Sequence, residues 1–148
     1  MERVQGTIEI AAPPAEVMRA LADFPSYPAW SGFQQCEVRA TGPDGRATEV
    51  HVVLAMGPVT ATYTIAIEYL DADAGLRWRF VEGSGITNTE GEYRLEAGGA
   101  GTVVHYSGAA DANLPVPGFV KRKLIAEGQK IGRDKALKGL KAFVETGR

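Results

Sequence analysis

PGFVKRKLIAEGQKIGRDKALKGLKAFVETGR, the stretch from Pro117 to Arg148, predicts one long amphipathic helix. Such a helix runs roughly 39 Å, the width of a small domain. The middle of its apolar line is made of glycine and alanine, whereas a helix that only fills a core would carry large side chains there. We therefore expect it to lie across a sheet and to leave space beneath its middle. The line consists of Val116, Val120, Leu124, Gly128, Gly132, Ala136, Leu140 and Val144.

The spacing of this line predicts a bend in the helix. A strict spacing of four residues gains roughly 40° at each step when a turn holds ~3.6 residues, so the whole line cannot face one sheet. We expect a change of direction near Gly128–Gly132. The half before it would close a cavity, and the half after it would anchor the helix on the sheet through Leu137, Leu140, Phe143 and Val144.

Length and composition predict a single domain over residues 1–148. The longest apolar runs are far shorter than the ~18 residues of a membrane span, and no signal-peptide pattern opens the chain. Cys36 is the only cysteine, which excludes an internal disulfide. We expect a cytoplasmic protein, either a monomer or a homodimer.

The net charge of −2 conceals an asymmetry. Residues 121–148 contain nine Lys/Arg against three Asp/Glu, while residues 1–120 contain seven against fifteen. A basic helix face can bind nucleic acid or anionic lipid, or can simply be solvated beside an acidic sheet. No aromatic residues interleave with these basic residues and no nucleic-acid motif is present, so we expect no nucleic-acid partner.

The order of elements predicts an α+β fold. Val4–Ile10 alternates as a half-buried strand, Pro13-Pro14 open a helix over residues 15–22, and a second short helix follows at Ser26–Trp30. Turn clusters then separate six further strands, which indicates an antiparallel sheet with the helices on one face. These strands are expected at 33–40, 48–56, 59–69, 76–81, 87–95 and 102–110, with a tight reversal at Gly57-Pro58.

The alternation of side chains assigns an apolar inner face to this sheet. That face is either a filled core or a cavity with apolar walls and a few hydroxyl groups. Three inward tyrosines favour a cavity, because a ligand or water would then supply the partner that each buried hydroxyl needs. The expected ligand-binding residues are Phe33, Val52, Leu54, Met56, Tyr63, Ile65, Ile67, Trp78, Phe80, Tyr93, Tyr106, Val120, Leu124, Gly128 and Ile131.

Few residues offer catalytic chemistry. His51 and His105 fall on the outward face, and we expect neither a metal site nor a cofactor. Cys36 is interpreted as a small buried residue rather than a nucleophile. The tentative acid/base groups are Tyr63, Tyr93 and Tyr106, whose first role we expect to be the orientation of a ligand by hydrogen bonds.

Several short segments together resemble the START-like (SRPBCC) superfamily, in particular its bacterial polyketide cyclase/dehydrase and coenzyme-Q-binding-protein-like branch. They are IAAPPAEV (residues 10–17), LADF (21–24), YPAW (27–30), GEYRL (91–95), GTVVHY (101–106) and ALKGLK (136–141). The resemblance implies a helix-grip fold, in which a curved seven-stranded antiparallel sheet wraps around a long C-terminal helix. It also implies a ligand cavity between sheet and helix, and it agrees with the two short helices predicted after the first strand.

The resemblance implies two kinds of function. Some members of the superfamily are aromatase/cyclases that fold and dehydrate a poly-β-ketone chain, and others bind or carry lipids, quinones, sterols or hormones. In the better-known cyclases a pocket arginine and a pocket tyrosine assist the reaction, whereas here the central inner strands lack arginine and Phe33 stands where a pocket tyrosine would be expected. Our leading hypothesis is therefore the binding of an apolar small molecule such as a lipid, a quinone or a polyketide. A cyclase/dehydrase and a protein- or ribosome-interacting module that uses the basic helix face are the alternatives.

Overall fold

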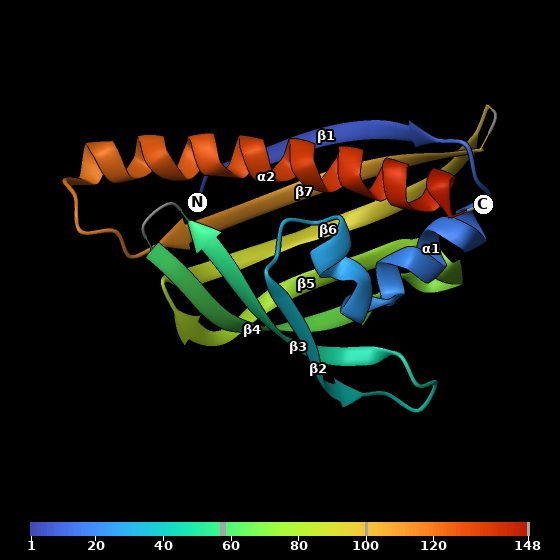
Figure 1. Cartoon of the computed structure of the whole chain (residues 1–148), viewed down its shortest axis with the longest axis horizontal. Coiled ribbons are helices and arrows are strands. Elements are labelled where there is room, and N and C mark those ends of the chain that lie inside the picture. Colours follow the sequence, from blue (N-terminus) through green and yellow to red (C-terminus); the bar gives the residue numbers. More distant parts are fainter. Residues whose placement is uncertain (57–58, 100, 148) are drawn as a thin grey trace.

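The computed structural model describes residues 1–56, 59–99 and 101–147. Within them, seven antiparallel strands form one curved sheet in the order β1-β7-β6-β5-β4-β3-β2 (Figure 1). The long helix α2 (Gly118–Thr146) lies across the concave side of the sheet, with α1 (Pro14–Ala22) and the 3-10 helix η1 (Phe24–Ala29) beside its C-terminal half. The predicted helix-grip α+β fold is confirmed. The strands are β1 (Arg3–Ile10), β2 (Gln35–Thr41), β3 (Ala47–Met56), β4 (Val59–Tyr69), β5 (Gly75–Ser84), β6 (Ile86–Gly98) and β7 (Gly101–Ala112).

The predicted strands match the observed ones closely, and β4 has the predicted bounds. The last three strands are longer than predicted because pairing continues into their glycine-rich ends, as in the pair Gly98↔Gly101. A second 3-10 helix, η2 (Asp71–Asp73), forms the turn between β4 and β5. The reversal predicted at Gly57-Pro58 lies outside the described residues.

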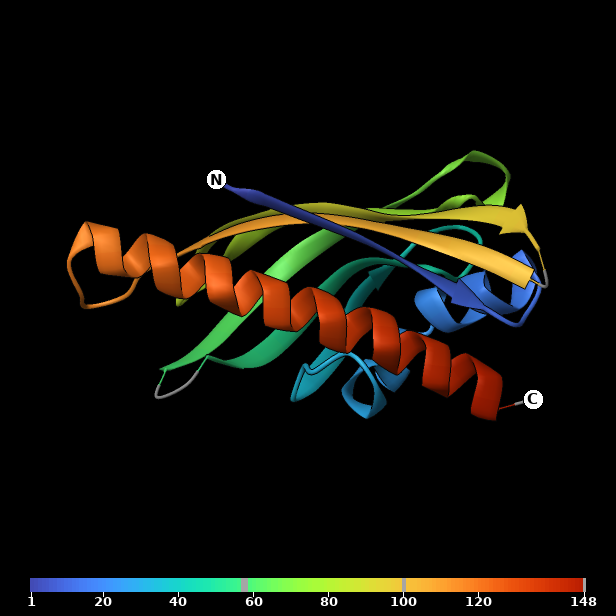
Figure 2. The ribbon, with the colours of Figure 1, turned by 90° about the horizontal axis from the view of Figure 1, so that it is seen from above.

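Helix α2 continues without a break from Gly118 to Thr146, so the bend predicted near Gly128–Gly132 is wrong (Figures 1 and 2). The helix packs on β1, β7 and α1. Its sheet-facing line follows the true period of ~3.6 residues and passes through polar side chains in its middle. A straight helix is possible because these polar groups bind the backbone of the edge strand β1.

Three side chains of α2 donate hydrogen bonds to carbonyl oxygens of β1 and the residue before it. Gln129 Nε2 lies 3.0 Å from the oxygen of Glu2, an Arg133 guanidinium nitrogen lies 3.1 Å from that of Gln5, and Lys141 Nζ lies 2.8 Å from that of Glu9. Gln129 also accepts a bond from the amide of Ala110 in β7. Edge strands present unpaired backbone groups, and here the helix satisfies them.

A filled core occupies the end of the molecule near α1 and η1. Pro14 opens α1, whose Val17, Met18 and Leu21 are at most 1% exposed. Leu140 of α2, which is also fully buried, meets this cluster. In η1, the rings of Phe24 and Tyr27 stack at 4.6 Å, and the Tyr27 hydroxyl donates to the carbonyl of Leu21 at 2.6 Å.

The anchoring residues of α2 differ from the prediction at one position. Ala136, Leu137, Leu140 and Val144 are buried. Phe143, expected to pack on the sheet, is 37% exposed and instead lies beside Trp30 of the η1 segment, with ring centroids 6.5 Å apart. It falls to one side of the buried line, where η1 rather than the sheet is its neighbour.

Candidate functional site

Most of the predicted wall residues on the strands lie on the inner side of the sheet. Val52, Tyr63, Ile65, Ile67 and Tyr93 are buried. The remainder are half-buried and pack against the same core: Phe33, Leu54, Met56, Trp78, Phe80 and Tyr106. The sheet therefore brings the predicted strand residues onto one continuous apolar surface.

The predicted wall residues on α2 are placed differently. Val120 is half-buried, but Leu124 and Ile131 are 49% and 66% exposed, and Gly128 is exposed as well. The expectation that this part of the helix forms an inner wall is wrong, because the straight helix turns these residues away from the sheet. The inward position is held by Ile125, which packs against the core and was not predicted.

Three aromatic rings form a compact cluster at the centre of the inner surface. Centroid distances are 5.6 Å between Trp78 and Tyr93, 5.9 Å between Trp78 and Tyr106, and 5.3 Å between the two tyrosines. Glycines make room for the rings, since a Cβ on Gly91 would lie 2.3 Å from the Trp78 ring. Trp78 Nε1 donates to Thr89 Oγ1 at 3.3 Å, so the indole is fixed in place.

The hydroxyl groups of the three inward tyrosines differ from those of the other tyrosines. Tyr27 and Tyr69 donate to backbone carbonyls, but no hydrogen bond among the described residues involves the hydroxyl of Tyr63, Tyr93 or Tyr106. In this same part of the chain, no fully buried side-chain nitrogen or oxygen lacks a hydrogen-bond partner. Each of the three hydroxyls is therefore partly exposed to solvent, although its ring lies in the interior.

Burial keeps these tyrosines protonated. It raises the pKa of Tyr63 and Tyr93 above the usual value of 10.0, and the neighbouring Tyr106 adds to both shifts. It raises the pKa of Tyr106 to about 12, against the opposing effect of the nearby Arg133 guanidinium. Tyr106 is thus close enough to influence each of the other two, and at neutral pH all three hydroxyls can serve as hydrogen-bond donors.

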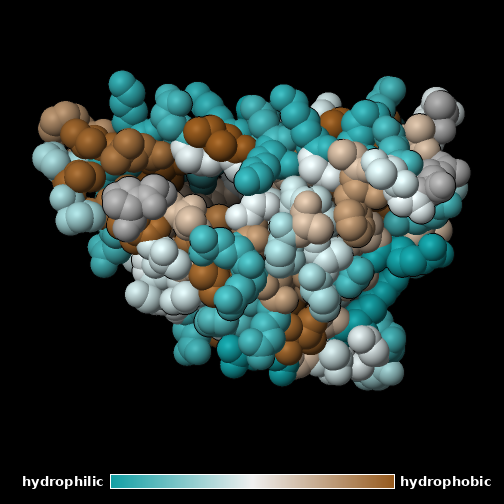
Figure 3. Space-filling view, viewed as in Figure 1, coloured by the Kyte–Doolittle hydropathy of each residue, from teal (hydrophilic) through white to brown (hydrophobic). Residues whose placement is uncertain are grey.

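Leu54, Met56 and Phe80 on the strands, Leu114 before α2 and Ile125 on α2 are only half-buried and pack against the core. Figure 3 shows the surface hollowed beneath the middle of α2, with apolar atoms gathered around the hollow. Gly128 and Gly132 on α2 face open space, since a Cβ added at either would meet nothing within 4 Å. The hollow beneath α2, called the opening below, and the inner surface of the sheet behind it form the candidate site.

Sequence reasoning missed the polar part of this region. Arg133 is one of the basic helix residues for which the sequence suggests either a macromolecular partner or solvation, yet it donates to the carbonyl oxygen of Gln5 and lies near Tyr106. Gln129 was not singled out, although it joins β1 to β7. Counting back from Leu140 in steps of ~3.6 residues, rather than four, reaches both positions and would have found them.

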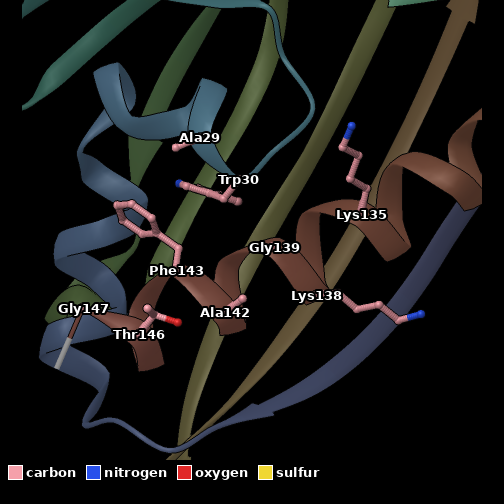
Figure 4. A pocket seen from close by; sticks show the side chains of 9 residues that line it. All are labelled: Ala29, Trp30, Lys135, Lys138, Gly139, Ala142, Phe143, Thr146 and Gly147. Carbon is pink, nitrogen blue, oxygen red and sulfur yellow. The ribbon is translucent and has the colours of Figure 1, made fainter.

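Two surface depressions lie away from the candidate site. Among the described residues that line them, Tyr106 is the one that was predicted as a wall of the ligand site. A shallow groove of about 700 Å³ runs between η1 and the last turns of α2 (Figure 4). Its floor is the Trp30–Phe143 pair, and the side chains of Lys135 and Lys138 extend away from that pair. A second depression of about 400 Å³ involves β1, β6 and β7 and is lined largely by polar residues such as Glu92, Arg94 and His105.

The remaining reactive groups have structural partners or are inert. His51 Nδ1 lies 3.0 Å from Thr64 Oγ1, and His105 Nε2 lies 3.1 Å from a carboxylate oxygen of Glu96. Burial raises the pKa of the Cys36 thiol to about 12, so it carries almost no thiolate at neutral pH. Neither the histidines nor the cysteine forms a nucleophile–base pair among the described residues.

Several solved structures share the architecture of this chain. A START superfamily protein from Mycobacterium smegmatis is 24% identical, with a TM-score of 0.79 over 96% of this chain and 98% of that chain. A protein from Thermus thermophilus is 23% identical, with a TM-score of 0.87 over 99% of both chains. An aromatase/cyclase from Streptomyces sp. R1128 is 17% identical, with a TM-score of 0.82 over 97% of this chain and 93% of that chain.

A family model shows the family to which the chain belongs. The model described as "Polyketide cyclase / dehydrase and lipid transport" matches residues 1–145, and the chain belongs to that family. No curated protein matches the sequence. Among the described residues, none of the helices is long and apolar enough to span a membrane.

Proposed function

We propose that the protein binds an apolar small molecule, such as a lipid, a quinone or a polyketide, in the space between the sheet and α2. The observation that carries this proposal is the state of Tyr63, Tyr93 and Tyr106. Their rings lie in apolar surroundings, their hydroxyls are accessible, and no described protein group accepts a hydrogen bond from them. A ligand with an apolar body and one or two carbonyl oxygens would satisfy these donors.

Family membership supports the same class of ligand, because the family description covers both polyketide chemistry and lipid transport. The pKa shifts favour binding over base catalysis. A tyrosine whose pKa lies at about 12, as for Tyr106, donates a hydrogen bond at neutral pH but does not abstract protons.

The test is a binding titration with a panel of fatty acids, short-chain quinones and polyketide mimics, combined with native mass spectrometry of protein purified from its own host. Tyr63→Phe and Tyr106→Phe should weaken a carbonyl-containing ligand by roughly fivefold to tenfold, the effect of one lost hydrogen bond. Tyr69→Phe is the matched control, since its hydroxyl already donates to Ala47 at 2.9 Å. Absence of any co-purified or added apolar ligand would contradict the proposal.

A cyclase/dehydrase is the second candidate, and the proximity of Arg133 to Tyr106 favours it. A cation beside a phenol helps that phenol to hold a carbonyl oxygen on which negative charge develops. In this case Tyr106→Phe should abolish turnover of a poly-β-ketone mimic and leave its affinity nearly unchanged. A carrier would show the reverse, with reduced affinity and no turnover by either protein.

A further inference from the structure

The first half of α2 carries a group of exposed apolar side chains beside the opening. Phe119 is 71% exposed, Ile131 is 66% exposed and Leu124 is 49% exposed, and Val116 just before the helix is 37% exposed. Figure 3 shows apolar atoms gathered over this part of the molecule. Leu124 and Ile131 stand seven residues apart, about two turns along the same side of the helix. Large apolar residues clustered on a surface mark an interaction site.

The same segment is strongly basic. Lys121, Arg122 and Lys123 follow soon after Phe119, and Lys130 precedes Ile131, while Glu127 is the only acidic residue in residues 112–132. Lys121 approaches Asp111 at 3.9 Å. In the described part of the chain, no ion pair involves Arg122, Lys123 or Lys130. The surface therefore combines apolar side chains with uncompensated positive charge.

We propose that this surface, Val116 to Ile131, docks on an anionic lipid bilayer. The apolar side chains enter the boundary between headgroups and acyl chains, and the basic side chains bind the acidic headgroups. A nucleic acid would match the charge but would leave Phe119, Leu124 and Ile131 in water. A second copy of the chain would match the apolar residues but would bring two basic surfaces together.

The position of the surface gives the docking a purpose, and this step rests on the proposed function. The hollow beneath α2 lies beside the same stretch of helix (Figure 3). Gly128 and Gly132 on this stretch face open space, with no atom within 4 Å of an added Cβ. A helix that lies on the bilayer through Leu124 and Ile131 brings the opening to the lipid surface. An apolar ligand then passes between bilayer and protein without crossing water.

Vesicle flotation of the full chain tests the proposal, with vesicles of phosphatidylcholine alone and of phosphatidylcholine mixed with phosphatidylglycerol. We expect binding to the mixed vesicles that weakens at high salt. The variant Phe119→Ser/Leu124→Ser/Ile131→Ser and the variant Arg122→Gln/Lys123→Gln/Lys130→Gln should each lower the partition coefficient by roughly tenfold or more. The controls are Val81→Ser, an apolar residue 43% exposed on β5, and Arg19→Gln/Arg39→Gln/Arg79→Gln, which removes the same charge elsewhere.

Either of two flotation results would overturn the proposal: no flotation with anionic vesicles at low salt, or equal flotation of the parent and both triple variants. It would also be overturned if the protein bound ribosomes or RNA in preference to vesicles. The same holds if the parent were a dimer that the serine variant converts to a monomer. Circular dichroism of each variant establishes that it is folded. A binding titration of the serine variant with a water-soluble short-chain quinone separates the two proposals. If the variant still binds the quinone but no longer floats, docking has been lost while ligand binding has not.

Discussion

Two glycines on α2 show how differently the same residue type is used. Gly139 lies against the η1 segment, where an added Cβ would be 2.0 Å from the carbonyl oxygen of Trp30. Gly132, about two turns earlier, has open space around it. Gly139→Ala should therefore destabilise the protein by about 1–3 kcal/mol through overpacking, whereas Gly132→Ala should stabilise it by up to about 1 kcal/mol through helix propensity. Urea unfolding of the two variants measures both effects, and equal midpoints would contradict the assignment of Gly139 to a close contact.

The buried tyrosines and Cys36 predict a loss of stability in alkali. Burial raises the pKa of Tyr106 from 10.0 to about 12 and that of Cys36 from 9.0 to about 12. Above pH 9 to 10 the unfolded chain releases these protons while the folded chain keeps them, so stability is complete below this range and falls as the pH rises toward about 12. The urea midpoint should decrease over this interval, and Tyr93→Phe should make the decrease shallower. Tyrosinate absorbance from all five tyrosines of the native protein near pH 10 would contradict this prediction.

At the scale of elements, α2 stabilises the edge strand β1 through side chains rather than through a strand partner. Gln129, Arg133 and Lys141 donate to carbonyls of β1 and of Glu2 just before it, over distances of 2.8–3.1 Å. Gln129→Leu combined with Arg133→Met should lower the free energy of unfolding by about 1–3 kcal/mol and speed the exchange of amides in β1. Lys130→Met is the control, since Lys130 is exposed. Hydrogen exchange followed by mass spectrometry would contradict the role of α2 if β1 remained as protected as before.

The elements were predictable from the sequence because each depends on local patterns. Alternation and turn clusters located the strands, and β4 was predicted with its observed bounds. The path of α2 was not predictable in the same way. Its uncharged line suggested a bend, but side chains as polar as Gln129 and Arg133 face the sheet, because their partners are backbone groups of a segment more than a hundred residues away. Such partners leave no trace in the helix itself.

The candidate site, too, was predictable on the side of the strands but not on the side of α2. Side-chain alternation placed Tyr63, Tyr93 and Tyr106 on one inner surface, and the structure brings them together. The helix side of the site could not be derived, because it depends on the direction in which a straight α2 crosses the sheet. As a result Leu124 and Ile131, expected as walls, lie exposed on the side of α2 that is turned away from the sheet.

The whole molecule is divided into a filled end and an open end. Near α1 the residues Met18, Leu21, Leu76 and Leu140 are at most 1% exposed, and the strands and helices close on one another. At the opposite end the inward Leu54, Met56 and Phe80 are only half-buried. One end of the helix thus holds the fold together, and the ligand site that we propose lies toward the other end, where the inward side chains are less buried.

This division predicts that equal truncations have unequal effects. Leu140→Ala creates a cavity in the filled end and should cost about 2–5 kcal/mol of stability, as large-to-small core substitutions do. Leu54→Ala removes a side chain that already borders the space, so its cost should be below about 1.5 kcal/mol, and it should change the preferred ligand toward a bulkier one. Thermal unfolding measures the first effect, and a titration with apolar ligands of graded size measures the second. Equal losses of stability would mean that side chains fill both ends alike, and the space that borders Leu54 would then be too small to accept a ligand.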